Sequence, residues 1–73
     1  MTETFLRYSL RHNRPVRVLF AEDMKYRNIT VVLMEGDTFT YITSRSKKTC
    51  TLPLSALLAA GYARGDHGET ESL

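Results

Sequence analysis

The feature that most constrains the fold is a succession of four β-patterned stretches between residues 14 and 58, each ended by a short polar turn. Residues 15–21 alternate with the period of two that is typical of a strand, and residues 38–44 are mostly β-branched or aromatic. Residues 26–35 carry apolar side chains on both faces, which indicates a long strand that bends to serve two halves of a barrel. With residues 49–54 as the fourth stretch, the sequence predicts a mainly β protein: a small, closed, antiparallel barrel of four to five strands.

A short α-helix is expected before the first strand, over residues 2–12. Thr2 is a suitable N-cap, and an apolar stripe follows it at helical spacing. Asn13 suits the left-handed conformation that ends many helices, and Pro15 cannot donate to a continuing helix. Because so short a helix is not stable alone in water, we expect it to pack on the barrel.

The segment after the fourth stretch allows two interpretations. Residues 58–62 can form a short closing strand, or residues 55–64 can form a C-terminal helix, which Gly61 destabilises by about 1 kcal/mol. The strand is the preferred interpretation. We expect one domain over residues 1–64, followed by a disordered acidic tail over residues 65–73.

Composition narrows the cellular setting and the partners. The single cysteine of this 73-residue chain cannot form an internal disulfide, and no apolar run approaches the ~20 residues that span a bilayer. The N-terminus lacks the basic and apolar regions of a secretion signal, so we expect a cytoplasmic protein without membrane association. Three of the eight acidic residues lie in residues 65–73, which leaves ten basic and five acidic side chains in residues 1–64. This net charge of +5 permits an anionic partner.

Short motifs give the chain a family resemblance. The expected helix is followed by Asn-Arg-Pro-Val at residues 13–16, Tyr41 stands within Thr-Tyr-Ile, and residues 52–57 read Leu-Pro-Leu-Ser-Ala-Leu. With these motifs, residues 5–60 resemble the small SH3/Sm-like barrels related to the WYL domain. The resemblance implies a stand-alone barrel of that kind, and WYL-type domains act as ligand-sensing or nucleic-acid-binding regulatory modules. Thr40 stands where that family has its signature Trp.

A basic end of the barrel is the strongest candidate site. In an antiparallel meander, the turn after the first strand and the turn after the third strand lie at the same end. Glu22 and Asp23 oppose five basic residues there, which leaves a net charge of +3. Such cations with tyrosines beside them suit nucleic acid or another anionic ligand, and the alternative is a solvated turn that only serves solubility. The predicted site residues are Lys25, Arg27, Arg45, Lys47 and Lys48, flanked by Tyr26 and Tyr41.

No pattern of catalytic, cofactor-binding or metal-binding residues is recognisable, so we expect a binding module without a cofactor rather than an enzyme. Cys50 alternates in phase with Leu52 and Leu54, which favours a small core residue over a reactive thiol. The competing hypothesis is a protein-interaction module. An exposed edge along the fourth strand and an apolar helix favour a homodimer or a protein partner that docks by strand addition.

Overall fold

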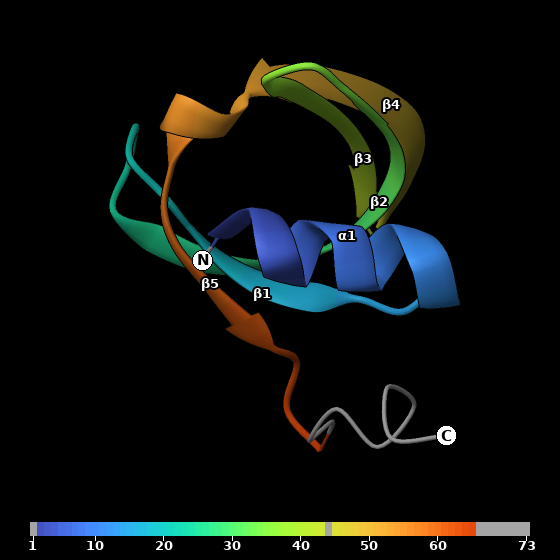
Figure 1. Ribbon diagram of the computed structural model, residues 1–73. Helices are drawn as coiled ribbons and strands as arrows, with labels where there is room; N and C mark the ends of the chain where they lie inside the picture. Colours follow the sequence, from blue (N-terminus) through green and yellow to red (C-terminus); the bar gives the residue numbers. More distant parts are fainter. Residues whose placement is uncertain (1, 44, 66–73) are drawn as a thin grey trace.

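Residues 2–43 and 45–65 are described by a computed structural model, in which five antiparallel strands form one sheet (Figure 1). A short helix, α1 (Thr2–His12), precedes the strands over the range that the sequence predicts. The order of the strands in the sheet is β4-β3-β2-β1-β5, so the mainly β class is confirmed. The strands are β1 (Val16–Phe20), β2 (Lys25–Glu35), β3 (Thr38–Thr43), β4 (Ser46–Pro53) and β5 (Leu57–Tyr62), with a 3₁₀ turn, η1 (Leu54–Ala56), before β5.

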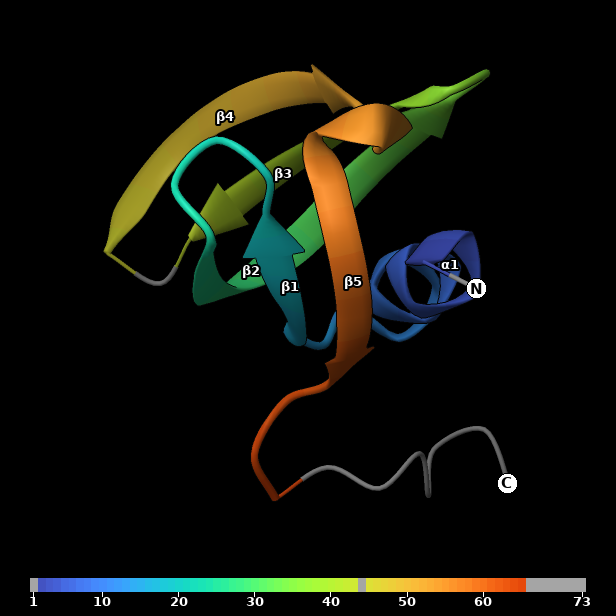
Figure 2. The same ribbon diagram turned by 90° about the vertical axis from the view of Figure 1, so that its left-hand side faces the viewer.

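The expectation of a closed barrel is wrong, because the sheet curls but stays open, with β4 and β5 as its two edges (Figures 1 and 2). Alternating sequence patterns predict curvature, whereas closure needs a ladder of hydrogen bonds between the two edge strands. Pro53 ends β4 without an N–H to donate, and the chain turns away through η1. Two backbone hydrogen bonds anchor this turn: Leu54 N donates to Asp37 O at 2.7 Å, and Ala21 N donates to Ala56 O at 2.9 Å. A 3₁₀ turn therefore connects the two edges, which do not pair in the described part of the chain.

Strand β2 belongs to both halves of the sheet, as its length and its two apolar faces predict. Residues 25–29 pair with β1, and residues 30–35 pair with β3. A bulge between Val31 and Leu33 shifts the alternation by one residue. Leu33 is consequently 51% exposed, although simple alternation places it on the buried face of Val31, and Met34 packs against the core instead.

Helix α1 packs its apolar stripe on the sheet, mainly against β2 and β5 (Figure 2). Leu6 and Ser9 are completely buried, and Tyr8 is nearly so. The ring of Tyr62 in β5 meets the rings of Phe5 and Tyr8 edge-on, with centroid distances of 5.0 and 5.1 Å. Tertiary packing therefore supplies the stability that a helix of this length lacks on its own.

A buried serine ties the end of α1 to the bend in β2. Ser9 Oγ donates to the carbonyl of Arg14 at 2.6 Å and accepts the N–H of Val31 at 2.9 Å. Val31 adjoins the bulge, where the ladder to β3 is irregular. Asn13, with a φ of 52°, ends the helix in the left-handed conformation that the sequence predicts. One hydroxyl thus satisfies two backbone groups together: the carbonyl of Arg14, just after the helix, and the N–H of Val31 in the bent strand.

Strand β4 differs from its sequence prediction in two ways. It begins at Ser46, three residues earlier than expected, so Lys47 and Lys48 lie in a strand and not in a turn. Cys50 pairs with Tyr41 and is exposed, so the prediction of a core cysteine is wrong. The reason is the open sheet: β4 is an edge, and no described strand covers its outer side.

Residues 57–62 form strand β5, so the strand interpretation of this segment is correct and the helix interpretation is wrong. The strand pairs with β1 without closing the sheet. Residues 66–73, which carry most of the predicted acidic tail, lie outside the described residues. Among the described residues, no helix is both long enough and apolar enough to cross a membrane.

Candidate anion-binding surface

Two adjacent hollows lie beside the first part of β2. Both are lined by Tyr26, Arg27 and Asn28, so the two hollows adjoin each other along β2. The larger hollow, of about 530 Å³, adds Thr43 and Arg45. The smaller hollow, of about 270 Å³, adds two further arginines. We call the combined lining the basic surface: Arg17, Tyr26, Arg27, Asn28, Thr43, Arg45 and Arg64.

The change of partner along β2 creates this surface. Because β3 pairs only with residues 30–35, no described strand covers residues 25–29 on the side away from β1. The connection between β3 and β4 stands beside this uncovered stretch, where Arg45 and Arg27 line the same hollow. The sequence predicts that the two basic turns lie at one end of the sheet. In the structure, one arginine from each region, Arg27 and Arg45, does line the same hollow.

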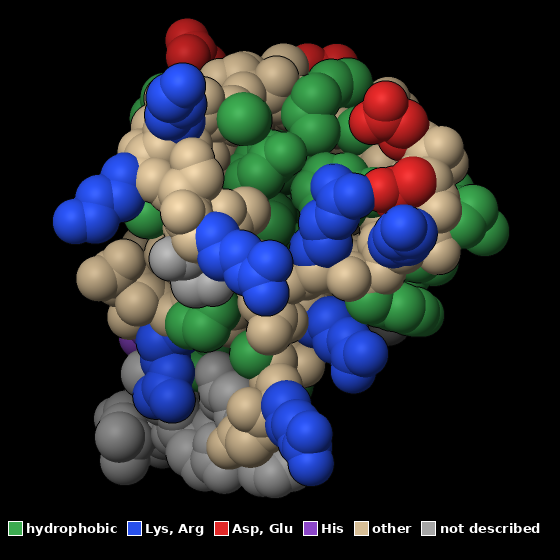
Figure 3. Space-filling view, turned by 180° about the vertical axis from the view of Figure 1, so that it is seen from behind, with side chains coloured by type: hydrophobic (Ala, Val, Ile, Leu, Met, Phe, Trp, Pro, Cys, Tyr) green, Lys and Arg blue, Asp and Glu red, His purple; other side chains and the backbone are tan. Residues whose placement is uncertain are grey.

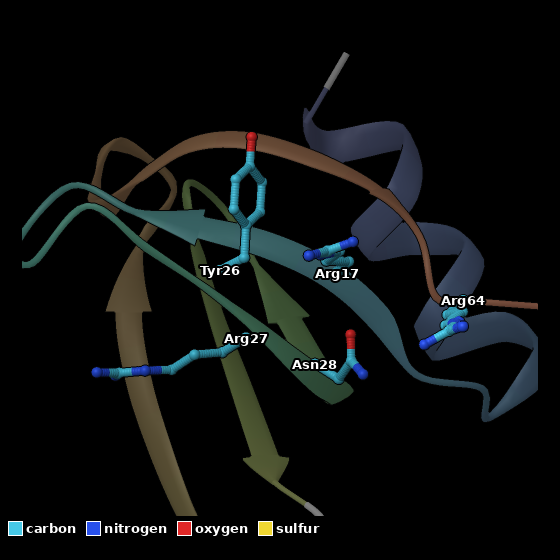
Figure 4. A pocket seen from close by; sticks show the side chains of 5 residues that line it. All are labelled: Arg17, Tyr26, Arg27, Asn28 and Arg64. Carbon is cyan, nitrogen blue, oxygen red and sulfur yellow. The ribbon is translucent and has the colours of Figure 1, made fainter.

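Arg27 is already engaged by the turn that precedes β2. Its side chain points away from the other side chains of the smaller hollow (Figure 4). The guanidinium donates to a carboxylate oxygen of Asp23 and lies 5.2 Å from the ring centroid of Phe20. Asp23 also accepts the backbone N–H of Lys25 at 3.1 Å, which fixes the turn. Asp23 thus offsets much of the charge that Arg27 brings to the surface.

Three arginines supply the charge that remains for a ligand. Among residues 2–43 and 45–65, no carboxylate lies within ion-pair distance of Arg17, Arg45 or Arg64, and no acidic residue lines either hollow. All three side chains are exposed. Because these arginines are exposed, they stay in contact with water when they bind a phosphate group. Binding therefore avoids the large desolvation cost of a buried ion pair.

The predicted site residues do not all meet. Tyr26, Arg27 and Arg45 lie on the basic surface. The three lysines lie outside both hollows: Lys25 begins β2 opposite Phe20, and Lys47 and Lys48 are exposed along β4. Their charges act on an approaching anion at longer range, where salt screens them.

Tyr41 is half-buried at the margin of the core and lines neither hollow. Its ring centroid lies 5.6 Å from that of Phe39 and 5.9 Å from that of Phe20. Burial raises the pKa of Tyr41 above its ordinary value of 10.0, and the neighbouring Cys50 thiol raises this pKa further, partly offset by Arg27. The residue is therefore a packing residue with a neutral hydroxyl rather than an open stacking surface.

Sequence reasoning missed Arg17, Asn28, Thr43 and Arg64. A signal for Arg17 was present, because the alternation of β1 turns this residue away from the buried Val16 and Val18. Arg64 follows β5, and it reaches the surface because β5 pairs with β1 across the intervening residues 21–56. No local pattern reveals a pairing of that kind.

Figure 3 shows the side of the molecule opposite α1, where Lys and Arg side chains are spread around a central apolar patch and Asp and Glu side chains lie toward the upper margin. Among the described residues, no group of three or more His, Cys, Asp or Glu side chains is arranged to hold a metal ion. Comparisons of the chain with protein families, with curated proteins and with solved structures found no match.

Proposed function

We propose that this protein is a nucleic-acid-binding module whose ligand lies across the basic surface. The observation that carries the proposal is the placement of the exposed ring of Tyr26 in both hollows, with arginines on either side and no carboxylate in their lining. Arginine binds phosphate through charge-assisted hydrogen bonds, and an exposed aromatic ring stacks with a base. Nucleic acid offers both a phosphate and a base, whereas a simple anion offers only the charge.

Two sequence expectations belong to this proposal. The resemblance to SH3/Sm-like and WYL-like barrels includes nucleic-acid-binding regulatory modules, and a helix followed by a five-stranded antiparallel sheet is compatible with it. A cytoplasmic location, which is expected from the sequence, would place the protein where RNA is accessible. Fold alone does not assign function, so the basic surface remains the main support.

The proposal is tested by titrating fluorescent single-stranded RNA and DNA of about ten nucleotides, a length that small single-strand-binding domains cover. Binding is expected at low salt. The logarithm of the binding constant should fall linearly with the logarithm of the salt concentration. Arg45→Ala should reduce the salt slope by about one phosphate contact, ~0.7 to 0.9 in log–log units.

Arg7→Ala is the matched control, because it removes the same charge from α1, where Arg7 pairs with Glu3 away from both hollows. If Arg7→Ala and Arg45→Ala weaken binding equally, the interaction depends on net charge and not on this surface. An absence of binding at low salt, together with unmoved amide resonances at residues 25–28 and 43–45, contradicts the proposal outright.

A second candidate function is self-association or protein docking through the edge of β4. Every residue of this strand except Leu52 is exposed, and the strand has no described neighbour on its outer side. Lys47 and Lys48 oppose this function, because edge lysines discourage strand addition. Sedimentation at several concentrations distinguishes the two: a persistent dimer that does not bind oligonucleotides favours the second candidate.

A further inference from the structure

The smaller hollow lies on the outer face of the sheet, opposite the core. Arg17 pairs with Asn28 across β1 and β2, and Tyr26 pairs with Leu19, so register places Arg17, Tyr26 and Asn28 on one face. Val16 and Val18, the neighbours of Arg17 in β1, are completely buried on the other face. The hollow is thus built on a rigid, paired part of the sheet and not on a loop.

An arginine and a tyrosine form a preorganised pair in this hollow. The guanidinium carbon of Arg17 lies 4.9 Å from the ring centroid of Tyr26, within the range of a cation–π interaction. Tyr26 is nevertheless 57% exposed, so part of its side chain is accessible to a base. Figure 4 shows the Asn28 amide on the same side of β2, where its donor and acceptor can meet the edge of a base.

The strand beside this pair carries no side chain at the position that pairs with Arg17. Gly61 in β5 pairs with Arg17, and a Cβ placed on Gly61 would meet no heavy atom within 4 Å. The next residue on this face of β5 is the small Ala59, opposite Leu19. Arg64, which follows β5, lines the far side of the hollow. The hollow therefore has space for a flat base, between two arginines that are able to hold the adjacent phosphate.

We propose that this outer hollow is a nucleotide subsite for an unpaired base, and that the ligand of the basic surface is single-stranded. In this subsite the base stacks on Tyr26, Asn28 contacts the base edge, and Arg17 and Arg64 hold the adjacent phosphate. A duplex hides the faces of its bases, so only a single strand can use Tyr26 in this way. The inference rests on the proposed function and extends it, because the larger hollow with Arg45 holds a second part of the same strand.

The experiment compares a single-stranded oligonucleotide with a duplex of the same length and sequence, at one fixed salt concentration. We expect the wild-type protein to bind the single strand at least fivefold more tightly, the effect of one base stacked on an aromatic ring. Tyr26→Leu should lose that preference, and Arg64→Ala should weaken single-strand binding severalfold more than the control Arg7→Ala does.

Gly61→Val tests the subsite without changing any charge. The added side chain enters open space beside Arg17, and a β-branched residue is well tolerated in a strand, so the fold should persist. Single-strand affinity should fall at least fivefold while circular dichroism stays unchanged. Should the Gly61→Val protein not fold, Tyr26→Leu and Arg64→Ala decide the question.

The outcomes separate this inference from the proposed function. If Arg45→Ala and Tyr26→Leu weaken binding but Gly61→Val and Arg64→Ala bind as the wild type does, the subsite is disproved and the proposed function stands. Equal affinity of the wild type for duplex and single strand also overturns the subsite. If the wild type binds neither nucleic acid, both proposals fail together.

Discussion

The two halves of the sheet are held in different ways. In the helix-covered half, which consists of α1, β1, β5 and residues 25–29 of β2, Leu6, Val16 and Val18 are completely buried. In the uncovered half, which consists of residues 30–35 of β2 with β3 and β4, helix α1 reaches the sheet through the hydrogen bond from Val31 to Ser9, and the two strands β3 and β4 contribute only Phe39 to the buried core. Burial of apolar surface is the main stabilising term, so most of the stability resides in the helix-covered half.

The basic surface lies where these halves meet. Arg17 lies in β1 of the helix-covered half, and Arg64 follows β5 of the same half. Thr43 ends β3 of the uncovered half, and Arg45 directly precedes β4. The better-packed half can hold a precise subsite, whereas the less buried half can adjust to a ligand, because regions with few buried contacts open at lower free energy. The difference in packing thus corresponds to a difference in what each half can contribute to binding.

The largest test of this comparison uses one leucine from each half. Leu6→Ala removes a completely buried side chain under α1 and should lower the free energy of unfolding by about 2–5 kcal/mol. Leu52→Ala removes a half-buried side chain from β4 and should cost less than half as much. Urea denaturation followed by circular dichroism measures both variants, and equal losses would show that the uncovered half is as well packed as the other.

A second comparison removes one hydroxyl from each half. Ser9→Ala leaves the buried N–H of Val31 without its acceptor and should cost about 1–3 kcal/mol. Thr51→Val removes the exposed hydroxyl hydrogen bond between Thr51 and Thr40 in the uncovered half, which should change stability by less than about 0.5 kcal/mol. Denaturation midpoints of the two variants give the difference. A Ser9→Ala protein as stable as Thr51→Val would mean that water reaches the bulge and replaces the hydroxyl.

Local patterns predicted the elements of this fold well. Helix α1 and the succession of antiparallel hairpins from β1 to β4 follow from caps, polar turns and periods of two. The bulge beside Val31 did not follow, because the N–H of Val31 donates to Ser9, a residue far away in the sequence, and no local pattern indicates that contact. The open sheet was missed for a similar reason, since closure depends on whether two distant edges meet.

The candidate site was only partly predictable. The meeting of Arg27 and Arg45 followed from the topology of consecutive hairpins, which sequence patterns indicate. The engagement of Arg27 by Asp23 did not follow from counting charges, because it depends on side-chain direction in the turn. Arg64 required knowledge that β5 pairs with β1. The sequence therefore indicated where the surface lies, whereas long-range strand pairing determines which residues line it.

The margin between the halves can be probed through Tyr41. Burial and the Cys50 thiol raise the pKa of Tyr41 above 10.0, so the folded protein holds this proton more tightly than the unfolded chain does. The resulting stabilisation is fully present below about pH 10 and is lost as the pH rises through the folded-state pKa. Comparing the wild type with Tyr41→Phe between pH 8 and 11, the wild type should lose more stability above pH 10, and parallel curves would place Tyr41 in open solvent.

The smallest expected effect concerns one turn from each half. Met24, in the β1–β2 turn, has a φ of 57° and is 65% exposed, and its N–H donates to the carbonyl of Phe20 at 2.9 Å. The left-handed conformation costs a residue with a side chain about 1–2 kcal/mol. Glycine avoids that cost but loses about 0.5–1 kcal/mol through its freer unfolded chain. Met24→Gly should therefore raise the free energy of unfolding by about 0.5 kcal/mol, from the balance of these two terms.

Gly36 provides the matched control in the uncovered half, because its φ is 60° and no atom lies within 4 Å of an added Cβ. Gly36→Ala should lower stability by about the same amount that Met24→Gly raises it, because the same two terms, backbone strain and the freedom of the unfolded chain, then act with opposite sign. Thermal unfolding of the two variants measures both shifts. Opposite signs would show that the two turns obey one backbone rule despite the different packing around them. A loss of stability in Met24→Gly would instead mean that the exposed Met24 side chain makes a contact that stabilises the junction between the halves.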